Sequence, residues 1–345
     1  MKTQDNRKTI SAIAEKCGVS PMTVSRALRN SSAVKSETRD KILAAAEALG
    51  YNGPLKSGRP ALPEDGSRPS VEIIIGNSGK NLAMFYSELL TSIEQELSKH
   101  SYDCVIRTCG NDYAQFVSLR ESIKNSKAAA SMIFGDFEPE KLKSLLAIAP
   151  DSILLDNPGG SFIGRPFNSI SFDNTEAAFS AVNHLIQNGR KKIVLIKGSK
   201  EHYFSAEMED GYRNALAASA IDFDEKLILE GDFSAESAFE QINSLMDRKI
   251  RFEAVFTNDE MACGVYRALA QHNISIPRDV AVCGCDGLPV CEQLTPRLST
   301  VKLDYSQLGP LAVEWFLNNI GKRISCPCRM KLFPKLVVRE SSSNN

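Results

Sequence analysis

The sequence has few of the features that mark membrane proteins, secreted proteins and common nucleotide-binding enzymes. None of its apolar runs approaches the roughly 18–20 residues that a membrane-spanning helix needs. The first residues, M-K-T-Q-D-N-R-K, contain no apolar segment of the kind found in a secretory signal, so we expect a cytoplasmic protein. Neither G-x-G-x-x-G nor G-x-x-x-x-G-K-[ST] occurs, and the two common phosphate-binding motifs are therefore absent.

Histidine is scarce, and the nine cysteines are not arranged for a zinc site. The four histidines stand in unrelated contexts, none with the spacing of metal ligands or of a catalytic triad. Two C-x-C pairs are present but no C-x-x-C motif, and the odd number of cysteines is compatible with reduced thiols. Alternation along a strand places Cys283 and Cys285 on one face, where buried thiols are common. We therefore expect no metal, no cofactor and no enzymatic activity.

The net charge of the whole chain is close to zero, at −1, but the charged residues are unevenly distributed. Residues 1–60 contain eleven Lys or Arg and five Asp or Glu, a net charge of +6, whereas the remaining residues carry −7. A basic segment on an acidic body favours contact with phosphates at one end of the chain. The alternative interpretation is a basic terminus that is merely solvated.

The segment from Thr9 to Leu28 predicts two short helices joined by a glycine turn. It reads T-I-S-A-I-A-E-K-C-G-V-S-P-M-T-V-S-R-A-L, with apolar residues on an inner face and hydroxyls and an arginine outside. Ser20 is a suitable N-cap for the second helix and Pro21 a suitable first residue. A small helix pair with a polar, basic outer face fits the major groove of DNA.

The remaining sequence divides into a third helix, a linker and a large body. A helix capped by Ser36 would complete a compact head at residues 1–52. Residues 53–70 hold four prolines and three glycines, which exclude a long helix or a central strand and indicate a linker. In residues 71–345, apolar runs alternate with amphipathic stretches, which predicts parallel, doubly wound α/β sheets.

Nine candidate strands are many for one doubly wound sheet, and the length suits two lobes. They are Val71–Ile75, Asp103–Arg107, Ser131–Phe134, Ser152–Leu155, Ser169–Phe172, Lys192–Ile196, Leu227–Leu229, Ala254–Phe256 and Val280–Cys283. A last helix, Ser306–Asn319, and a last strand, Met330–Val337, would complete one or both lobes.

These residues resemble the lactose-repressor (LacI/GalR) family of bacterial transcription regulators. The head matches T-I-x-x-I-A-x-x-x-G-V-S-x-x-T-V-S-R-x-L from Thr9 and continues with V-K-S-E-T-R-D-K-I-L-A-A-A-E-A-L-G-Y from Val34. The body matches in H-L-I-Q-N-G-R-K-K-I from His184, F-T-N-D-E-M-A-C-G from Phe256 and I-P-R-D-V-A-V-C-G-C-D from Ile276. The motifs occur in the expected order along nearly the whole chain.

The resemblance implies a helix-turn-helix head and a body with the type I periplasmic-binding-protein fold, in which the chain crosses three times between two lobes. One lobe would take residues 71–168 and 305–332, and the other residues 169–304 and 333–345. The family's assembly implies a homodimer, associated with the nucleoid, that binds a near-palindromic operator in double-stranded DNA and represses transcription. A small-molecule effector, expected to be a sugar, would bind between the lobes and control operator affinity.

In the family, the start of the second helix contacts base edges, and those positions match Pro21, Met22 and Arg26. Arg26 can donate a pair of hydrogen bonds to guanine, whereas Pro21 and Met22 offer only apolar contact. Hydroxyl groups suit phosphates, which position the protein rather than specify the sequence. The hydroxyl candidates are Thr9, Ser20, Thr23 and Ser25.

The linker departs from the family pattern, in which a hinge helix inserts a leucine into the minor groove. Pro60 occupies the position of that leucine, so we expect no such helix. Leu55 or Leu62 in a shifted register is one alternative wedge. The segment S-G-R-P also resembles an AT-hook, in which Arg59 would lie in a narrow minor groove. A plain flexible linker is the remaining interpretation.

Several positions of the body match those that line the sugar site in relatives. They are occupied by Asp156, Phe233, Asn258, Asp286 and Tyr305, with Asn77 and Phe85 after the first strand as further candidates. Met208 replaces the arginine of the family motif R-x-x-G-Y and cannot donate a hydrogen bond, so an acidic effector is disfavoured. A less polar ligand, a different orientation, a purine, a phosphosugar or no ligand stay open. Asp259 and Asn174 are interpreted as turn or helix-cap residues.

Three other classes of protein remain as alternatives. An enzyme would need a catalytic constellation that the histidines do not supply. A secreted sugar-binding protein would share the body but would need a signal segment in place of the head. A thiol sensor would use the C-x-C pairs. The motifs favour a DNA-binding regulator over each of these.

Overall fold

The computed structural model describes residues 10–28, 34–49, 68–76, 82–110, 112–149, 151–159, 163–164, 166–200, 202–319 and 327–343. Two compact units make up the chain. One comprises Met1–Ser67 and Glu314–Ile324, and the other comprises Arg68–Val313 and Ser325–Asn345. Among the described residues, no helix is both long enough and apolar enough to span a membrane.

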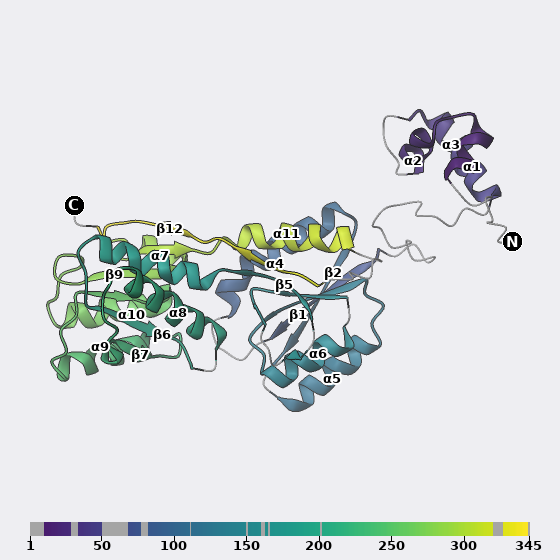
Figure 1. Cartoon of the computed structure of the whole chain (residues 1–345). Helices are drawn as coiled ribbons and strands as arrows, with labels where there is room; N and C mark the ends of the chain where they lie inside the picture. The colour runs from purple at the N-terminus through teal and green to yellow at the C-terminus, as the bar shows by residue number, and fades with distance from the viewer. Residues whose placement is uncertain are drawn as a thin grey trace. The chain divides into compact units, whose positions relative to one another are not determined.

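Three short helices form the head in the first unit: α1 (Ile10–Cys17), α2 (Pro21–Leu28) and α3 (Ser36–Ala48) (Figure 1). Ile13, Val24 and Ile42, one from each helix, are fully buried and form the centre of a small apolar core. The turn between α1 and α2 passes through Gly18, whose φ of +66° favours glycine. The expected helix-turn-helix is confirmed, but Ser36 is the first residue of α3 and not its N-cap, because the Arg39 N–H bonds to the Lys35 oxygen.

The first lobe of the second unit is built on a parallel sheet. Within the described residues this sheet has six strands in the order β11-β5-β4-β3-β1-β2. The strands are β1 (Ser70–Gly76), β2 (Asp103–Cys109), β3 (Ala130–Gly135), β4 (Ser152–Leu155), β5 (Asn168–Phe172) and β11 (Arg329–Leu332). Both faces are covered, as a parallel sheet requires.

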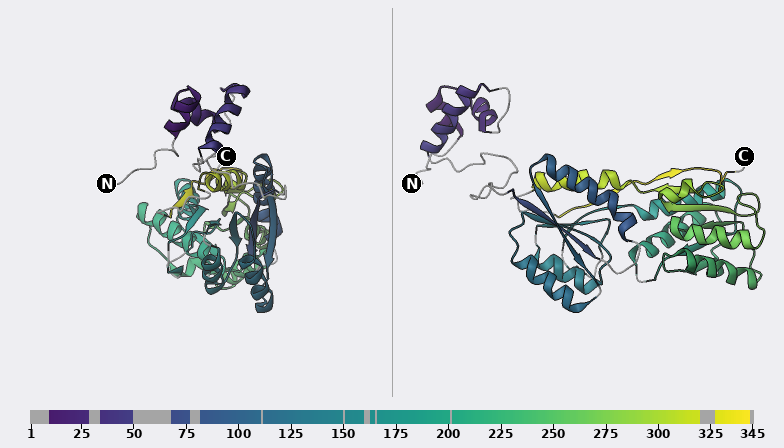
Figure 2. Two further views of the ribbon diagram at one scale, coloured as in Figure 1. Left: turned by 90° about the vertical axis from the view of Figure 1, so that its right-hand side faces the viewer. Right: turned by 180° about the vertical axis from the view of Figure 1, so that it is seen from behind.

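Four helices cover the faces of this first sheet. They are α4 (Leu82–Lys99), α5 (Tyr113–Lys124), α6 (Pro139–Ile148) and α11 (Tyr305–Asn319). The ribbon views place α5 and α6 on one face and α4 beside α11 on the other (Figures 1 and 2). At Gly309 the backbone of α11 packs so closely against Ser92 of α4 that an added Cβ would overlap the serine hydroxyl. This glycine allows the two helices to lie in direct contact.

The second lobe is also built on a mainly parallel sheet, with one antiparallel strand at its edge. Its sheet has six strands in the described residues, in the order β12-β10-β9-β8-β6-β7, and only the β10–β12 pair is antiparallel. The strands are β6 (Ile193–Lys197), β7 (Ile228–Glu230), β8 (Ala254–Phe256), β9 (Ala281–Asp286), β10 (Ser299–Lys302) and β12 (Lys335–Val337). The expected pair of doubly wound lobes is confirmed.

The helices of the second lobe pack as two close pairs. One pair is α7 (Asn174–Gln187) with α8 (Tyr203–Ala218), and the other is α9 (Ala235–Asp247) with α10 (Asp259–Gln271). A separate apolar core lies under each pair, one on each face of the sheet. A methyl group on Gly264 would overlap the backbone oxygen of Ala235, so this glycine lets α10 lie directly against the start of α9.

The sheet order corrects the expected lobe boundary at residue 168. Strand β5 belongs to the first lobe, because it pairs with β4 on one side and β11 on the other. The chain therefore crosses to the second lobe after Phe172, returns before Tyr305 and crosses again between β11 and β12. All residues of β5 are buried, so the strand needs a neighbour on each edge.

Two further expectations for strands were wrong. The single strand Met330–Val337 is two strands in different sheets, separated by Phe333 and Pro334, because proline cannot donate to a ladder. Strand β10 was not expected at all, since its buried residues Ser299 and Thr300 are polar. In addition, β1 begins inside the expected linker 53–70, and residues 53–67 of that linker, with Arg59 and the candidate wedge leucines, lie outside the described residues.

Candidate functional site

The start of helix α2 is fixed by the hydroxyl group predicted to cap it. The Ser20 Oγ accepts a hydrogen bond from the Thr23 backbone N–H at 3.1 Å and lies 2.9 Å from the Thr23 Oγ1. Pro21 is the first residue of the helix, where its missing N–H leaves no bond unmade. The predicted cap and first residue are therefore both present, and they orient the exposed side of α2.

The other side of α2 is held in the head's core. Val24, Ala27 and Leu28 are buried, whereas Ser20, Pro21 and Arg26 are exposed. Met22 is a large apolar side chain with 59% of its surface exposed. The exposed set therefore combines a guanidinium group, an apolar group and hydroxyls on one short helix. Of the other predicted residues, Thr9 and Arg59 lie outside the described residues, as does the side chain of Ser25.

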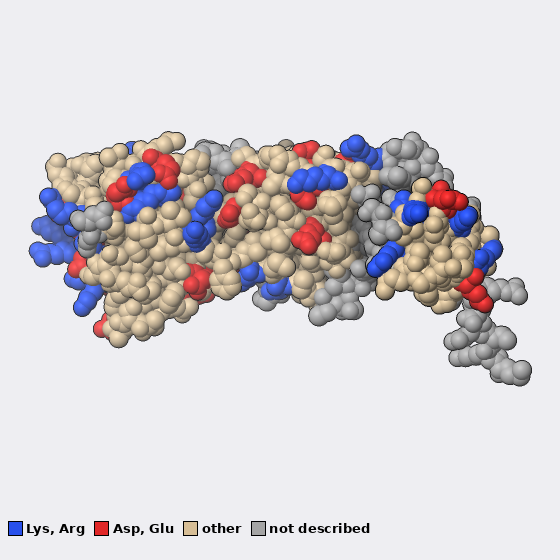
Figure 3. Space-filling model, turned by 90° about the horizontal axis from the view of Figure 1, so that it is seen from above, with Lys and Arg blue, Asp and Glu red and all other residues tan. Residues whose placement is uncertain are grey.

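The described part of the head carries basic and acidic side chains together. The space-filling view shows Lys and Arg in blue and Asp and Glu in red, and both colours occur on the head (Figure 3). The excess of positive charge predicted for residues 1–60 rests largely on other residues, because six of the eleven Lys and Arg there lie outside the described residues. Electrostatic attraction to phosphates would therefore draw on those segments as well as on the helices.

A second candidate site lies where strands of the two lobes end. Asp156 follows β4 with a φ of +52° and is 7% exposed. Its Oδ2 accepts a hydrogen bond from the Tyr305 hydroxyl at 2.8 Å. Its backbone oxygen accepts one from the hydroxyl of Tyr203, in the first turn of α8. Asp156 thus links the first lobe to the second lobe and to the start of α11.

Aromatic rings surround this aspartate from both lobes. Tyr305 lies edge-on to Phe172, with ring centroids 5.1 Å apart, and also edge-on to Tyr86 of α4 at 6.3 Å. In the second lobe, His202 stacks on Tyr203 at 4.5 Å. The His202 ring also packs edge-to-face with Phe233, another residue predicted for the effector site. The two ring centroids are 5.1 Å apart. The site therefore offers apolar ring faces as well as oxygen atoms, a combination that suits hydroxylated rings.

Burial controls the protonation of the acidic groups at this site. It raises the pKa of Asp156 to about 7, against the hydrogen bond from Tyr305 and with help from the charge of Glu207. Burial also raises the pKa of Asp286 well above its usual value, and the charges of Asp259 and Asp156 raise it further. Asp286 ends β9 with a φ of +120° and is 7% exposed. These carboxyl groups hold protons more tightly than free aspartates do.

Two of the other predicted effector residues, Asn258 and Met208, have structural contacts. Asn258 caps α10 by accepting a hydrogen bond from the Met261 N–H at 2.9 Å. Met208 has no exposed surface and packs in the core beneath α7 and α8. Asn77 and the side chain of Phe85 lie outside the described residues. The structure therefore brings together Asp156, Asp286, Tyr305 and Phe233, and places Met208 in the core.

Asp259 has a turn-forming role, as interpreted from the sequence. Its Oδ2 accepts from the backbone N–H groups of Gly287 and Leu288, both at 2.7 Å, and its Oδ1 accepts from the Thr300 hydroxyl at 2.6 Å. The interpretation of Asn174 as a cap was wrong. Asp173 caps α7, and Asn174 donates to Glu207 at 2.9 Å.

Sequence reasoning missed several groups at the second site. They are Tyr86, Asp136, His202, Tyr203 and Glu207. A usable signal exists for two of them: Tyr203 and Glu207 are four residues apart in the first turns of α8, so they share one helix face at the carboxyl end of β6. Tyr86 and Asp136 follow the first and third strands of the first lobe, at the same edge of that sheet.

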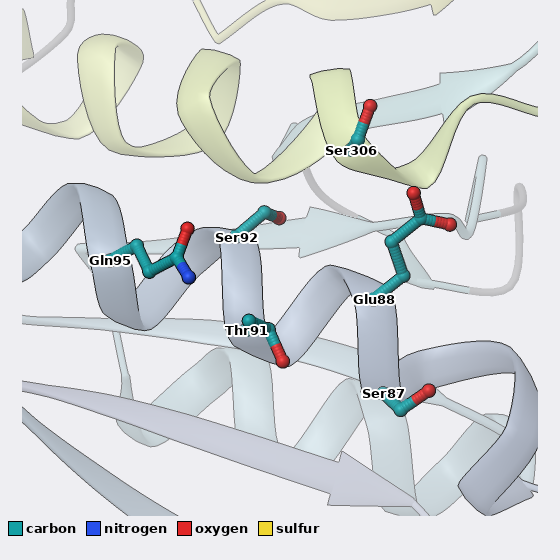
Figure 4. Close-up of a pocket in the computed structure, with 6 residues that line it drawn as sticks. All are labelled: Ser87, Glu88, Thr91, Ser92, Gln95 and Ser306. Carbon is teal, nitrogen blue, oxygen red and sulfur yellow. The ribbon is translucent and has the colours of Figure 1, made fainter.

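A surface pocket contains none of the predicted residues in its lining. It has a volume of about 330 Å³ and lies along α4, whose side chains line it together with one serine of α11 (Figure 4). The lining residues are Ser87, Glu88, Thr91, Ser92, Gln95 and Ser306. No group of three or more His, Cys, Asp or Glu in the described residues is arranged to hold a metal ion.

Two family models match the chain. The model described as bacterial regulatory proteins, lacI family, matches residues 9–53. The model described as periplasmic binding protein-like domain matches residues 182–342. The first covers the three helices of the head, and the second covers most of the second lobe together with α11, β11 and β12.

Individual relatives are similar over nearly the full length. The NTD biosynthesis operon regulator NtdR of Bacillus subtilis (strain 168) is 29% identical over 338 residues, which cover 97% of this chain and 99% of that protein. The ribose operon repressor of Haemophilus influenzae is 27% identical over 334 residues, with 96% and 98% covered.

Solved structures agree with the fold. A complex of the transcriptional regulator CelR with cellobiose has a TM-score of 0.71 and 26% identity, and the match covers 96% of this chain and 99% of that one. The lac repressor dimer bound to operator and the anti-inducer ONPF has a TM-score of 0.69 and 23% identity, with 97% and 98% covered. At that identity the second likeness concerns the fold alone.

Proposed function

Because the chain belongs to the LacI family of bacterial regulatory proteins, we propose that it is a sequence-specific DNA-binding repressor controlled by a small molecule. The structure of the head is the main support for this function. Helix α2 is capped by Ser20, its Arg26 and Met22 side chains are exposed, and its apolar side is buried. The names of the relatives fit, since they include an operon regulator and the ribose operon repressor.

Direct contact with bases is assigned to the exposed start of α2. Arg26 would donate two hydrogen bonds to the O6 and N7 atoms of guanine. Met22 and Pro21 would contact apolar groups such as a thymine methyl. The hydroxyls of Thr9, Ser20, Thr23 and Ser25, together with Arg59 in the linker, would contact the phosphates and the minor groove. A homodimer would place two heads on a near-palindromic operator, since two-fold symmetry in the protein matches two-fold symmetry in the site.

The effector site is assigned to the place where Asp156, Tyr305 and Asp286 lie close together. A sugar would use these oxygens as hydrogen-bond partners for its hydroxyls, and its ring would lie against Phe233 or Tyr305. Tyr203 of the second lobe donates a hydrogen bond to Asp156 of the first lobe, so a ligand that replaces this bond would change how the lobes are held. This is a physical route from ligand binding to the spacing of the heads.

The remaining parts of the function follow from the same family. We assign residues 1–52 to the DNA-binding head, 53–70 to the linker and 71–345 to effector binding and dimerisation. The protein would act in the cytoplasm, at the nucleoid, as a regulator and not as an enzyme. The prolines of the linker would prevent a hinge helix, so operator bending would be smaller than in relatives that insert a leucine.

The test is selection of genomic DNA fragments by the full-length protein, followed by binding measurements on the selected site. Arg26→Ala is expected to reduce the preference for that site over random DNA by about 5- to 150-fold, the loss of one bidentate contact. Arg26→Lys is the matched control, because it keeps the charge but loses the paired geometry. It should retain affinity for random DNA and lose the preference. A preference that survives in Arg26→Ala, or a wild-type protein with none, would contradict the proposal.

A further inference from the structure

Carboxylates from both lobes converge at the effector site. Asp156 ends β4 of the first lobe, and Asp286 ends β9 of the second lobe. The charge of Asp286 raises the pKa of Tyr86 and of Tyr305, which belong to α4 and α11 of the first lobe. Asp286 therefore lies close enough to these first-lobe residues for its charge to act on them. Asp136, after β3, acts on Tyr86 in the same way.

Asp286 is more than nine-tenths buried, yet one of its oxygens has no partner. Among the described residues, none donates a hydrogen bond to its Oδ2. Leaving a buried carboxylate oxygen without a donor is unfavourable, so such an atom needs a partner such as a water molecule, an ion or a ligand. This oxygen therefore marks a specific position for a donor supplied from outside the protein.

The charged groups that act on Asp286 are Asp259 and Asp156, and the charge of Asp286 in turn acts on the phenols of Tyr86 and Tyr305. Neither Asp156 nor Asp286 forms an ion pair with a described lysine or arginine. Lys331 is paired elsewhere, with Asp173 and Glu207 at 3.4 Å each. Met208 stands where the family pattern has an arginine, and it packs in the core. The site therefore has two acidic groups, and one oxygen of Asp286 has no donor among the described residues.

Neutral and cationic ligands would interact differently with Asp156 and Asp286. A hydroxyl group satisfies one oxygen by a hydrogen bond but supplies no positive charge, so the two neighbouring carboxyl groups still resist ionising together. A protonated amine has three donors and a positive charge, so it can bond two carboxylates at once and neutralise their repulsion. An acidic ligand would add to the repulsion.

We propose that the effector is a hydroxylated molecule bearing a protonated amine, such as an amino sugar, with its ammonium group between Asp156 and Asp286. The inference rests on the proposed function, because it names the chemical class of ligand for the same site. Tyr305 and Phe233 supply ring faces for the carbon skeleton, and the unpartnered oxygen of Asp286 accepts from the ammonium group.

The test compares amino sugars with neutral sugars of the same skeleton. Titration calorimetry on the full-length protein would use glucosamine, galactosamine and mannosamine, each beside its N-acetyl form and its parent hexose. At least one amine should bind about tenfold or more tightly than both of its neutral counterparts, since a charge-assisted bond to a carboxylate is lost in them. Equal affinity for the neutral partner would overturn the proposal, as would no measurable binding of any amine up to about 10 mM.

Two variants test whether the preference for amines depends on Asp286. Asp286→Asn keeps the shape of the side chain and removes its charge, and it should lower the ratio of amine affinity to neutral-sugar affinity about tenfold or more. Asp222→Asn is the matched control, because Asp222 is exposed and precedes β7, at the opposite end of the same sheet. It should change neither affinity. An unchanged ratio in Asp286→Asn would overturn the proposal.

DNA binding is measured separately, so the two proposals can fail independently. If the protein selects an operator but shows no preference for amines, the amine proposal fails and the repressor function stands. If it prefers amines through Asp286 but selects no DNA sequence, the repressor function fails instead. Asp286→Asn should still bind the operator, and loss of both activities in that variant would indicate a folding defect, which circular dichroism would detect. In that case Asp286→Glu becomes the test of the amine proposal. This variant keeps the negative charge, so it should retain the preference for amines.

Discussion

Raising the pH should destabilise the lobes through Asp156. The pKa of this carboxyl group is raised from 3.8 to about 7 in the folded protein, first because it is buried. Between these two values the folded protein holds a proton that the unfolded chain has released. The stability contributed by this proton is fully present below pH 3.8 and is lost as the pH rises through about 7.

The size of the effect follows from the shift. A change of about three pKa units at 1.36 kcal/mol per unit gives up to about 4 kcal/mol of unfolding free energy. Asp259, whose pKa burial raises to about 6, and Asp286 titrate in the same direction and add to the total. The Asp156→Asn variant isolates one contribution, because an amide does not titrate in either state.

The assay is urea unfolding followed by far-UV circular dichroism, at steps from about pH 4 to about pH 8. The wild type should lose more stability over this range than Asp156→Asn, by up to about 4 kcal/mol. Asp222→Asn, an exposed carboxylate in the second lobe, serves as the control and should follow the wild type. Parallel curves for the wild type and Asp156→Asn would refute the reasoning, since they would mean that Asp156 ionises as easily in the folded chain as in the unfolded one.

Three further predictions concern folding. Gly264→Ala should cost about 1–3 kcal/mol in urea unfolding, because its methyl group would overlap the Ala235 carbonyl and separate α10 from α9; an unchanged midpoint would contradict this packing. Asp259→Ala should cost about 3 kcal/mol or more by the same measurement, since two backbone N–H groups and a buried hydroxyl lose their acceptor; a loss below about 1 kcal/mol would contradict it. Ser20→Ala should lower the thermal stability of the head by about 1 kcal/mol, whereas Ser20→Asp should retain the cap.

Much of the fold could be predicted because local patterns and tertiary packing agree. The apolar runs at β1, β3 and β4 are buried on both faces of a parallel sheet, and such runs are visible in a sequence. Strand β10 was missed for the opposite reason. Its buried Ser299 and Thr300 are satisfied by contacts with residues far along the chain, such as the bond from the Ser299 N–H to the Ser341 Oγ. No short window of sequence contains that information.

The candidate sites show the same division. Ser20, Pro21 and Arg26 could be placed because capping and helix spacing are local rules. Asp156 and Asp286 were predicted from the resemblance and from their positions after strands. Their raised pKa values and the bond from Tyr305 depend on the approach of two lobes, which the sequence does not reveal. Met208 was assigned to the ligand from a motif, whereas its burial depends on how α8 packs.

The segment that supplies β11 to the first lobe and β12 to the second has a consequence for biosynthesis. A ribosome makes the strands in chain order, so every other strand has been synthesised before residues 329–337 emerge. Neither sheet can be completed until then, and both lobes must close late and close together. The head is different, because all three of its helices precede residue 50 and share one small core. During translation, a folded head would therefore be present while the second unit is still incomplete.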